Sequence, residues 1–152
     1  MFSPQDNLFM QRALELAAYA ASLQEVPVGA VLVHENKIVG EGYNSSITLH
    51  DPSAHAEIMA IRSAAKQIKN YRLLDTTLYV TLEPCMMCVG AIVHARIKQV
   101  IYGACDAKSG AIISKIQALD HSFLNHRVQH RGGLLAEPCG HILSEFFQKR
   151  RD

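Results

Sequence analysis

The chain has 152 residues, of which 49% are hydrophobic and 19% are charged, and its formal net charge is +1. This composition excludes a disordered chain, and no apolar run approaches the roughly 20 residues that a membrane-spanning helix requires. A total charge so near zero cannot by itself indicate a nucleic-acid partner, which would need a local basic patch. We expect a single domain over residues 1–152, long enough to bury a sizeable core.

The first helix is predicted from Pro4 to about Gln24, because Ser3 is a favourable N-cap and proline is favoured at the first helical position. Apolar residues recur along it at helical spacing, which gives the helix one face to bury. Residues 28–34 form an apolar run rich in β-branched side chains, and residues 38–43 can return beside it after a polar turn. These two segments predict a β-hairpin.

A second helix is predicted to begin at the stretch AHAE, residues 54–57, because the preceding DPS is a helix-start signal. Residues 77–82 alternate in polarity and are rich in β-branched and aromatic side chains, as strands are. Pro84 then opens a mostly apolar helix over residues 85–94, and residues 100–103 form the next predicted strand.

The polar loop CDAKSG, residues 105–110, follows, and residues 111–126 favour no single element. Residues 127–130 suggest a last strand, and residues 136–150 a closing helix. Strands that alternate with helices after an initial hairpin indicate a mixed sheet of about five strands that is covered on both faces. The predicted fold class is therefore α/β, a three-layer α/β/α sandwich, in which ligands bind near strand ends.

The chain begins MFSPQDNLF, which lacks the basic segment and long apolar stretch of a secretory signal. We therefore expect a cytoplasmic protein in a reducing compartment. The cysteines, which are Cys85, Cys88, Cys105 and Cys139, are then not expected to form a disulfide framework. The close pair is more typical of a metal-binding or redox-active site.

The stretch EPCMMC, residues 83–88, places Cys85 and Cys88 three residues apart at the start of a predicted helix. On a helix they share one face and can bind one ion, and the helix N-terminus favours their thiolate forms. No second CxxC is present to complete a structural zinc site. On this motif alone, a reducible pair of the thioredoxin type remains an alternative.

The stretch HAE offers the remaining groups that a catalytic metal site needs. His55 is a suitable third ligand at a helix start, and Glu57 lies near the same helix end. Alone, a histidine at a helix start is more often a surface or core residue without a functional role. A glutamate there is most often only favourable to the helix dipole. With the two cysteines, however, three ligands leave a fourth tetrahedral position for water, as in catalytic zinc sites. Glu57, which does not bind the metal, can then carry the proton of a water molecule that zinc activates.

H-x-E followed by P-C-x-x-C is the signature of zinc nucleobase deaminases. The likeness extends over nearly the whole chain through the stretches EVPVGAVLV (25–33), GEGYN (40–44), DPSAHAEIMAIR (51–62), TLYVTLEPCMMCVGAIVHARI (78–97), VIYGACDAKSGA (100–111) and LNHRV (124–128). With these stretches the chain resembles the bacterial tRNA-specific adenosine deaminases, which belong to the cytidine/deoxycytidylate deaminase superfamily and convert the wobble adenosine of an anticodon to inosine.

The resemblance implies a cytidine-deaminase-like fold and hydrolytic deamination by zinc-activated hydroxide. It also implies that His55, Cys85 and Cys88 bind one zinc ion per subunit and that Glu57 is the catalytic proton shuttle. Asn44 corresponds to a residue that hydrogen-bonds the flipped base. The family further implies a tRNA anticodon stem-loop as partner and a homodimeric assembly. No association with membranes is expected, because no apolar run is long enough to span one.

Contacts with RNA phosphates would need basic residues near the site. Lys108, Arg127, Arg131 and Arg150 are candidates, and we retain Lys108 and Arg150 as candidate substrate-binding residues. The basic tail QKRRD has an ordinary interpretation too, because basic residues are favoured at any solvent-facing helix C-terminus.

The helix stretch MMCVGAIV is more apolar than a metal-binding helix needs. This supports a homodimer, but burial in the core of one chain would explain it as well. Met86 and Met87 are expected to pack, Cys139 is expected in the core, and Phe146 and Phe147 are interpreted first as a core stripe.

The stretch GEGYNS lacks the third glycine of a dinucleotide-binding turn, so Gly40 and Gly42 are interpreted as sites of a bulge or of a close approach of backbone to substrate. Cys105 departs from the family pattern, in which this position is polar or basic, and no role is assigned to it.

Two other functions remain open at this level. A deaminase of free cytosine, guanine or another small heterocycle would use the same metal chemistry. A zinc-binding RNA module without turnover would use the same ligands but would not need Glu57. Assays with different substrates distinguish a free-base deaminase from a tRNA deaminase. Any turnover excludes a module that only binds RNA.

Overall fold

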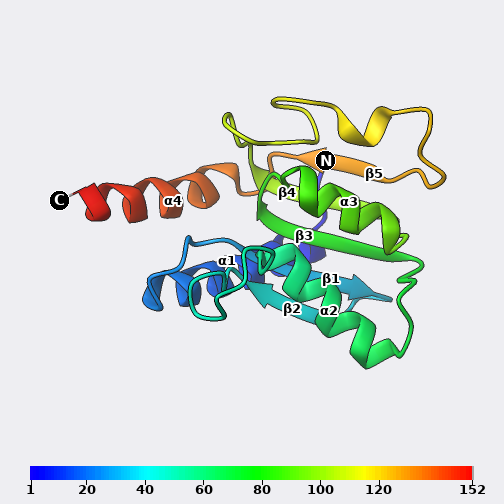
Figure 1. Cartoon of the computed structure of the whole chain (residues 1–152), viewed down its shortest axis with the longest axis horizontal. Helices are drawn as coiled ribbons and strands as arrows, with labels where there is room; N and C mark the ends of the chain where they lie inside the picture. Colours follow the sequence, from blue (N-terminus) through cyan, green and yellow to red (C-terminus); the bar gives the residue numbers. More distant parts are fainter. Residues whose placement is uncertain (152) are drawn as a thin grey trace.

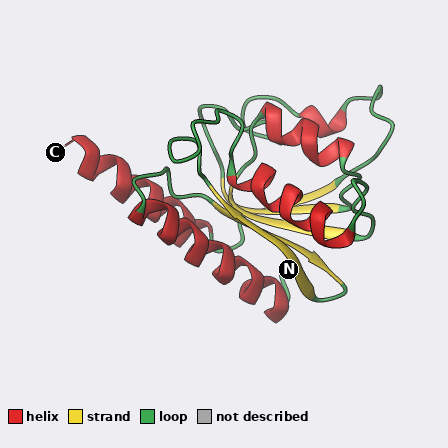
Figure 2. Cartoon of the chain, turned by 60° about the horizontal axis from the view of Figure 1, so that its bottom comes forward, coloured by secondary structure: helices red, strands yellow, loops and turns green. Residues whose placement is uncertain are grey.

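The computed structural model describes residues 1–151, in which one mixed β-sheet lies between two layers of helices (Figure 1, Figure 2). The strands are β1 (Gly29–His34), β2 (Lys37–Tyr43), β3 (Thr76–Leu82), β4 (Gln99–Ala104) and β5 (Gln129–Gly132). The helices are α1 (Pro4–Ser22), α2 (Ala56–Ile68), α3 (Met86–His94), the short 3-10 helix η1 (Ala118–Asp120) and α4 (Ala136–Arg151). Within these residues, the predicted mixed sheet of about five strands and the three-layer sandwich are confirmed.

The strand order across the sheet is β2-β1-β3-β4-β5. β1 is antiparallel to β2 and to β3, whereas β3, β4 and β5 are parallel to one another. The carboxyl ends of β3 and β4 therefore meet at one edge of the sheet, where the backbone N–H of Glu83 donates to the carbonyl of Ala104 at 2.8 Å. The segments that follow these two strands, Cys85 and the loop 105–110, are brought together by this topology.

Side chains of the central strands alternate between the two faces of the sheet, as the pleat requires. Val31, Tyr79 and Ile101 pack with α1 and α4 in one core. Leu32 and Val80 pack with α2 and α3 in the other. Figure 2 shows the same separation, with α1 and α4 on one side of the sheet and α2 and α3 on the other.

The start of α1 is held by a reciprocal pair of side-chain bonds. The hydroxyl of Ser3 accepts the backbone N–H of Asp6 at 3.0 Å, and the carboxylate of Asp6 accepts the backbone N–H of Ser3 at 2.8 Å. This capping box satisfies donors that every helix N-terminus leaves unpaired. Asp6 also accepts the hydroxyl of Tyr79 in β3 at 2.6 Å, so the helix start is tied to the sheet.

Gly40 and Gly42 let β2 lie directly against α2. A Cβ atom at Gly42 would overlap the helix backbone at Ala56 and Ala60, and one at Gly40 would overlap it at Ala60 and Ala64. The β1–β2 hairpin does contain a shift of register. The close approach, however, is to a helix and not to a substrate, which corrects the interpretation made from the sequence.

Two predicted boundaries also need correction. α2 begins at Ala56 rather than at residue 54, because Asp51 forms a turn in which its carboxylate accepts the backbone N–H of Ser53 at 2.9 Å. β5 begins at Gln129, two residues later than predicted. The segment 111–126, for which the sequence favoured no element, consists of turns and η1.

Some apolar side chains are exposed where burial was predicted. Cys139 and Phe146 are buried, as predicted, but Phe147 is exposed. Met86 is 70% exposed and Met87 is also exposed, so the expectation that both pack within the chain is wrong. Among the helices of residues 1–151, none combines the length and the apolar character needed to cross a membrane.

Candidate active site

His55, Cys85 and Cys88 meet where the N-termini of α2 and α3 converge near the end of β3. His55 is the N-cap residue of α2 and Cys85 is the N-cap residue of α3, and both have extended backbone conformations. Neither side chain makes the usual capping hydrogen bond to its own helix. Both side chains are therefore available to bind a ligand, together with Cys88 in the first turn of α3.

The spacing of these three side chains fits a metal ion. Their ligand atoms all lie within 4.8 Å of one another. Nδ1 of His55 is 3.6 Å from Sγ of Cys85 and 3.5 Å from Sγ of Cys88. Zinc bonds of about 2.3 Å to sulfur and about 2.05 Å to nitrogen, at a tetrahedral angle, would separate sulfur and nitrogen by about 3.6 Å. The donor set therefore fits tetrahedral zinc with one position open, and the histidine distinguishes it from a thioredoxin-type cysteine pair.

The electrostatics of the group favour a bound cation. The pKa of Cys85 is lowered to about 3, because Cys88 and His55 form hydrogen bonds to its sulfur. The pKa of Cys88 is raised, because its thiol makes that hydrogen bond and because it is buried. The pKa of His55 is raised mainly by its hydrogen bond to Cys85. One thiolate thus exists at neutral pH, and a bound cation would displace the proton of the second thiol.

Glu57 lies in the first turn of α2 and is only 4% exposed. Burial raises the pKa of its carboxyl group to about 7, because the charged form loses its hydration. Within the described residues, the carboxylate does not belong to the group of potential metal ligands. A carboxyl group whose pKa is near ambient pH can both accept and release a proton, which suits acid–base chemistry.

Glu57, His55 and Cys85 open onto a cavity of about 90 Å³. The side chains that line it are Val26, Val28, Asn44, His55, Glu57, Leu82, Glu83, Cys85, Asp106 and Ser109. Oδ1 of Asn44 accepts the backbone N–H of Ala56 at 2.8 Å. This bond satisfies a donor at the start of α2 and leaves the NH₂ group of Asn44 as a donor for a bound base.

The sequence interpretation missed several residues of this cavity. Val26, Val28 and Leu82 form its apolar walls, and Asp106 and Ser109 reach it from the loop after β4. The polar loop CDAKSG directly after a predicted strand was the available signal, since ligands bind near strand ends in sheets of this kind.

The candidate RNA-binding residues occupy different places. Lys108 is exposed in the loop 105–110, which contributes to the cavity. Arg150 does not reach the cavity and instead lines a groove of about 360 Å³ with Gln24, at the C-terminal end of α1. Because Val26 is two residues beyond Gln24 and lines the cavity, this groove lies beside the segment that leads to the active site.

Arg127 is exposed after η1. Arg131 holds the N-terminal segment in place: it donates to the carbonyl of Met1 at 3.0 Å, lies 4.8 Å from the ring centroid of Phe2, and approaches the carboxylate of Asp6 at 3.7 Å. These contacts give Arg131 a structural role at the N-terminal segment.

Comparisons with known proteins show the family of the chain. The model of the MafB19-like deaminase family matches residues 5–151. The tRNA-specific adenosine deaminase of Haemophilus influenzae is 56% identical over 148 residues, which cover 97% of this chain and 86% of that protein.

Two solved structures extend the comparison. One, from studies of A-to-I editing by tRNA:A34 deaminases at the wobble position of transfer RNA, is similar with a TM-score of 0.87 and 40% identity, over 90% of this chain and 99% of that one. The guanine deaminase from Bacillus subtilis is similar with a TM-score of 0.64 and 36% identity, over 95% and 93% of the two chains. From the family match, the high identity and the site geometry together, the chain belongs to the tRNA-specific adenosine deaminases within the MafB19-like deaminase family.

Proposed function

We propose that this protein deaminates adenosine hydrolytically to inosine at the wobble position of a tRNA anticodon, acting as one deaminase domain. The observation that carries the proposal is the buried Glu57 beside the group of His55, Cys85 and Cys88 at the 90 Å³ cavity. The relatives described above supply the substrate class, since their names specify tRNA, adenosine and the wobble position.

His55, Cys85 and Cys88 would hold one zinc ion, the cation that a nitrogen and two sulfur donors at tetrahedral spacing favour. When bound, zinc supplies a Lewis acid that lowers the pKa of water toward 7. The two helix N-termini at the site add favourable partial charge for the thiolates.

Glu57 carries the protons of the reaction. It accepts one proton from the attacking water and delivers it to N1 of adenine. It then takes the remaining proton of the new C6 hydroxyl and passes it to the amino group, which leaves as ammonia while the C6 carbonyl of inosine forms. A pKa of about 7 suits both directions of this transfer. Asn44 orients the base through its NH₂ group, while its Oδ1 atom stays bonded to the start of α2. The walls of Val26, Val28 and Leu82 exclude water from the base.

The RNA would reach the cavity along basic residues of the loop 105–110 and of the separate groove beside Gln24. Lys108 extends from the loop that lines the cavity, and Lys149 and Arg150 line the groove beside Gln24. An anticodon loop presents an unpaired base, so flipping it costs less than extracting a base from a duplex. Lys108 and Arg150 would then bind phosphates on either side of the flipped nucleotide. A reducing cytoplasm, where tRNA is processed, suits a site that needs two free thiols.

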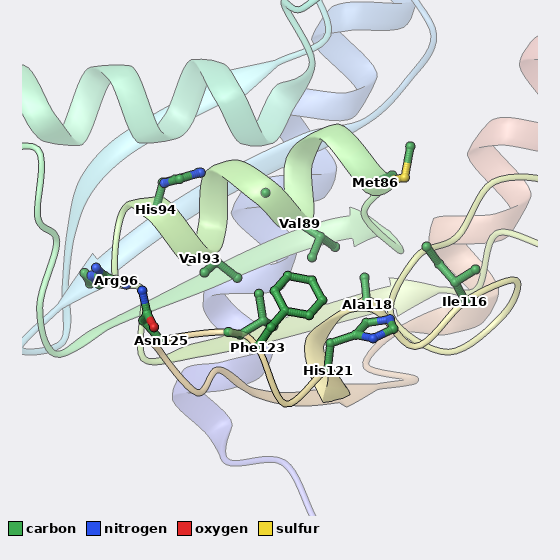
Figure 3. A pocket seen from close by; sticks show the side chains of 12 residues that line it. Met86, Val89, Val93, His94, Arg96, Ile116, Ala118, His121, Phe123 and Asn125 are labelled. Atoms are coloured by element: carbon green, nitrogen blue, oxygen red, sulfur yellow. The ribbon is translucent and has the colours of Figure 1, made fainter.

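We further propose a homodimer, formed through the outer face of α3. A groove of about 510 Å³ lies between α3 and the segment 116–125. In Figure 3, Val89 and Val93 of α3 face the ring of Phe123, which is 76% exposed. A Cβ atom at Gly90 would meet nothing within 4 Å, so another helix can approach the backbone closely there. Exposed apolar surface of this kind marks interfaces, and a two-fold axis would bury the same face of both copies.

The test of the function supplies purified protein with an anticodon stem-loop that bears a wobble adenosine. The controls are the same loop with cytidine at that position, free adenine and free guanine. We expect inosine and ammonia from the adenosine loop, with a rate at subsaturating RNA that falls as salt rises. Efficient deamination of a free base without activity on the stem-loop would assign the protein to nucleobase salvage, the alternative that the likeness to guanine deaminase represents.

A further inference from the structure

Glu83 is a buried carboxylate for which the proposed chemistry has no use. It follows β3 directly, two residues before Cys85, and is 2% exposed. Burying a carboxylate is costly unless its oxygens are hydrogen-bonded. The bonds that it makes therefore indicate what it does in the molecule.

The hydrogen bonds of the Glu83 carboxylate all lead to the segment 106–114, which follows β4. Oε2 accepts the backbone N–H groups of Ile112 at 3.1 Å, Ile113 at 2.9 Å and Ser114 at 3.0 Å. Oε1 accepts the backbone N–H of Asp106 at 3.0 Å and the hydroxyl of Ser114. One side chain thus binds both ends of the segment and draws it into a closed loop.

The backbone at Gly110 and Ala111 lies close to the Glu83 carboxylate and to the connection that follows it. A Cβ atom at Gly110 would overlap Cδ and Oε1 of Glu83, so the loop approaches the carboxylate as closely as only glycine allows. The backbone N–H of Ala111 also donates to the carbonyl of Pro84 at 2.9 Å. The loop is therefore bound to the short connection between β3 and Cys85.

The anchored loop forms one wall of the active-site cavity. Asp106 and Ser109 line the cavity together with Asn44. Within the loop, the carboxylate of Asp106 accepts the backbone N–H groups of Lys108 at 3.0 Å and Ser109 at 3.2 Å, and the hydroxyl of Ser109. The loop is thus rigid within itself, and its position relative to the cavity depends on Glu83.

We infer that Glu83 is a positioning residue, which sets the place of the 106–114 loop as the substrate-binding wall of the cavity. The inference rests on the proposed function for its substrate. Both carboxylate oxygens of Glu83 accept hydrogen bonds from the loop, and neither contacts the reacting atoms. Glu83 therefore affects substrate binding and leaves the proton transfer by Glu57 unchanged.

The variant Glu83→Gln tests this with almost no change in size. Its NH₂ group must face N–H or O–H donors that the carboxylate now accepts, so at least one end of the loop is released. We expect KM for the adenosine stem-loop to rise roughly tenfold, the effect of losing one charge-assisted hydrogen bond, with kcat within about threefold of wild type and zinc content unchanged. In Gly110→Ala the added methyl group overlaps the Glu83 carboxylate and displaces the loop. We expect the same rise in KM with little change in kcat or zinc content.

Two control variants separate positioning from general changes in stability: Met10→Ala is a destabilised variant, and Gly140→Ala is a glycine substitution without steric overlap. Met10→Ala removes a buried side chain on the opposite face of the sheet, and Gly140→Ala adds a methyl group where only ordinary contact exists. Both are expected to leave KM unchanged below their melting temperatures. An unchanged KM in Glu83→Gln, or a fall in kcat together with loss of zinc, would overturn the inference.

Amide hydrogen exchange gives a reading that does not depend on activity. The N–H groups of Ile112, Ile113 and Ser114 are expected to lose protection in Glu83→Gln, while those of β1 keep theirs. If wild type fails to deaminate the stem-loop, the proposed function is wrong, and the exchange data still decide the anchoring. Unchanged protection in this segment would reject the anchoring role whatever the substrate is.

Discussion

Glu57 and Asp6 are carboxylates shielded from solvent, yet their pKa values move in opposite directions. For Glu57 burial dominates and raises the pKa to about 7, because the lost hydration of the charged form outweighs the hydrogen bonds that it accepts. For Asp6 burial also raises the pKa, but hydrogen bonds from Tyr79 and Ser3 outweigh it and lower the pKa overall. Glu57 is thereby suited to exchanging protons, and Asp6 to remaining charged as part of the structure.

For Glu57, we predict that Glu57→Gln keeps its fold and its zinc but loses turnover by roughly 10²- to 10⁴-fold, because the amide cannot carry a proton. Metal analysis and single-turnover assays on the stem-loop measure the two properties separately. Loss of zinc in this variant would make Glu57 a ligand, and unchanged turnover would require a different base.

The metal ligands can be tested with a matched pair of cysteines. Cys88 and Cys139 are both fully buried, but only Cys88 belongs to the candidate metal group. Cys88→Ala is expected to lose most of the bound zinc, because each ligand contributes strongly to the affinity for the metal. Cys139→Ala is expected to retain about one ion per chain, because Cys139 is not a proposed ligand. Metal analysis after dialysis decides the point, and equal zinc in the two variants would contradict the ligand assignment.

Asp6 makes a prediction about stability and pH. Its pKa is lower in the folded chain than the ordinary value of 3.8, so its contribution is present above about pH 4 and is lost as the pH falls through the lowered value. Asp6→Asn is expected to reduce the free energy of unfolding by about 1–2 kcal/mol at pH 7, and by less at pH 3. Urea unfolding of both proteins at the two pH values measures this. A difference that stays constant with pH would refute the role of the charge.

At the scale of elements, the sheet and its helices approach each other through residues without large side chains. Gly40 and Gly42 of β2 lie against Ala60 of α2, and Gly29 of β1 lies against Ala13 of α1. Close backbone approach on both faces of the sheet leaves little room for change in side-chain volume. It also holds the start of α2, and with it His55, at a defined distance from the strands.

This packing predicts opposite effects for two glycine substitutions. Gly42→Ala is expected to destabilise the fold by about 1–3 kcal/mol, because the added methyl group overlaps the α2 backbone. Gly140→Ala in α4 meets only Ala104 at 3.9 Å and is expected to stabilise by up to about 1 kcal/mol, because alanine favours the helix. Urea midpoints of the two variants check both signs, and equal midpoints would argue against the tight β2–α2 contact.

At the scale of the whole molecule, the two helical layers differ in what they leave exposed. α4 extends past the edge of the sheet with its basic end outward (Figure 1). The outer face of α3 is instead apolar, and Met86 stands next to Cys85 in the chain, so a second copy bound there would lie near the active site. This proximity links the proposed assembly to the proposed RNA surface.

The dimer prediction is tested by charge placed on this face. Met86→Asp is expected to convert a dimer to a monomer at micromolar concentration, because burying an unpaired carboxylate is unfavourable. Leu8→Asp is the matched control, since Leu8 is 63% exposed on α1, across the sheet from α3. Sedimentation velocity separates the two masses. A wild-type protein that sediments as a monomer would contradict the proposal.

The sequence by itself was sufficient for the element order, the mixed sheet and the group of candidate site residues. These follow from local signals: Pro4 and Pro84 at helix starts, the period of two in the strands, and the spacing of HAE and PCxxC. The start of α2 was misplaced because Asp51 and Ser53 form a turn of their own before the helix. The N–H of Ala56 at the true start is bonded by Asn44, twelve residues earlier, and such a bond cannot be seen in the local sequence.

Only the tertiary structure could decide which side chains share the cavity and which surfaces stay exposed. Glu83 and Asp106 are far apart in sequence, and they meet because the parallel ends of β3 and β4 lie side by side. Likewise, residues 86–93 of α3 are all apolar or glycine, so the sequence could not show which of its faces is exposed, and the exposure of Met86 depends on what packs against the helix. Local pattern determines the type of element, whereas the free energy of long-range packing determines its neighbours, and function at this site depends on both.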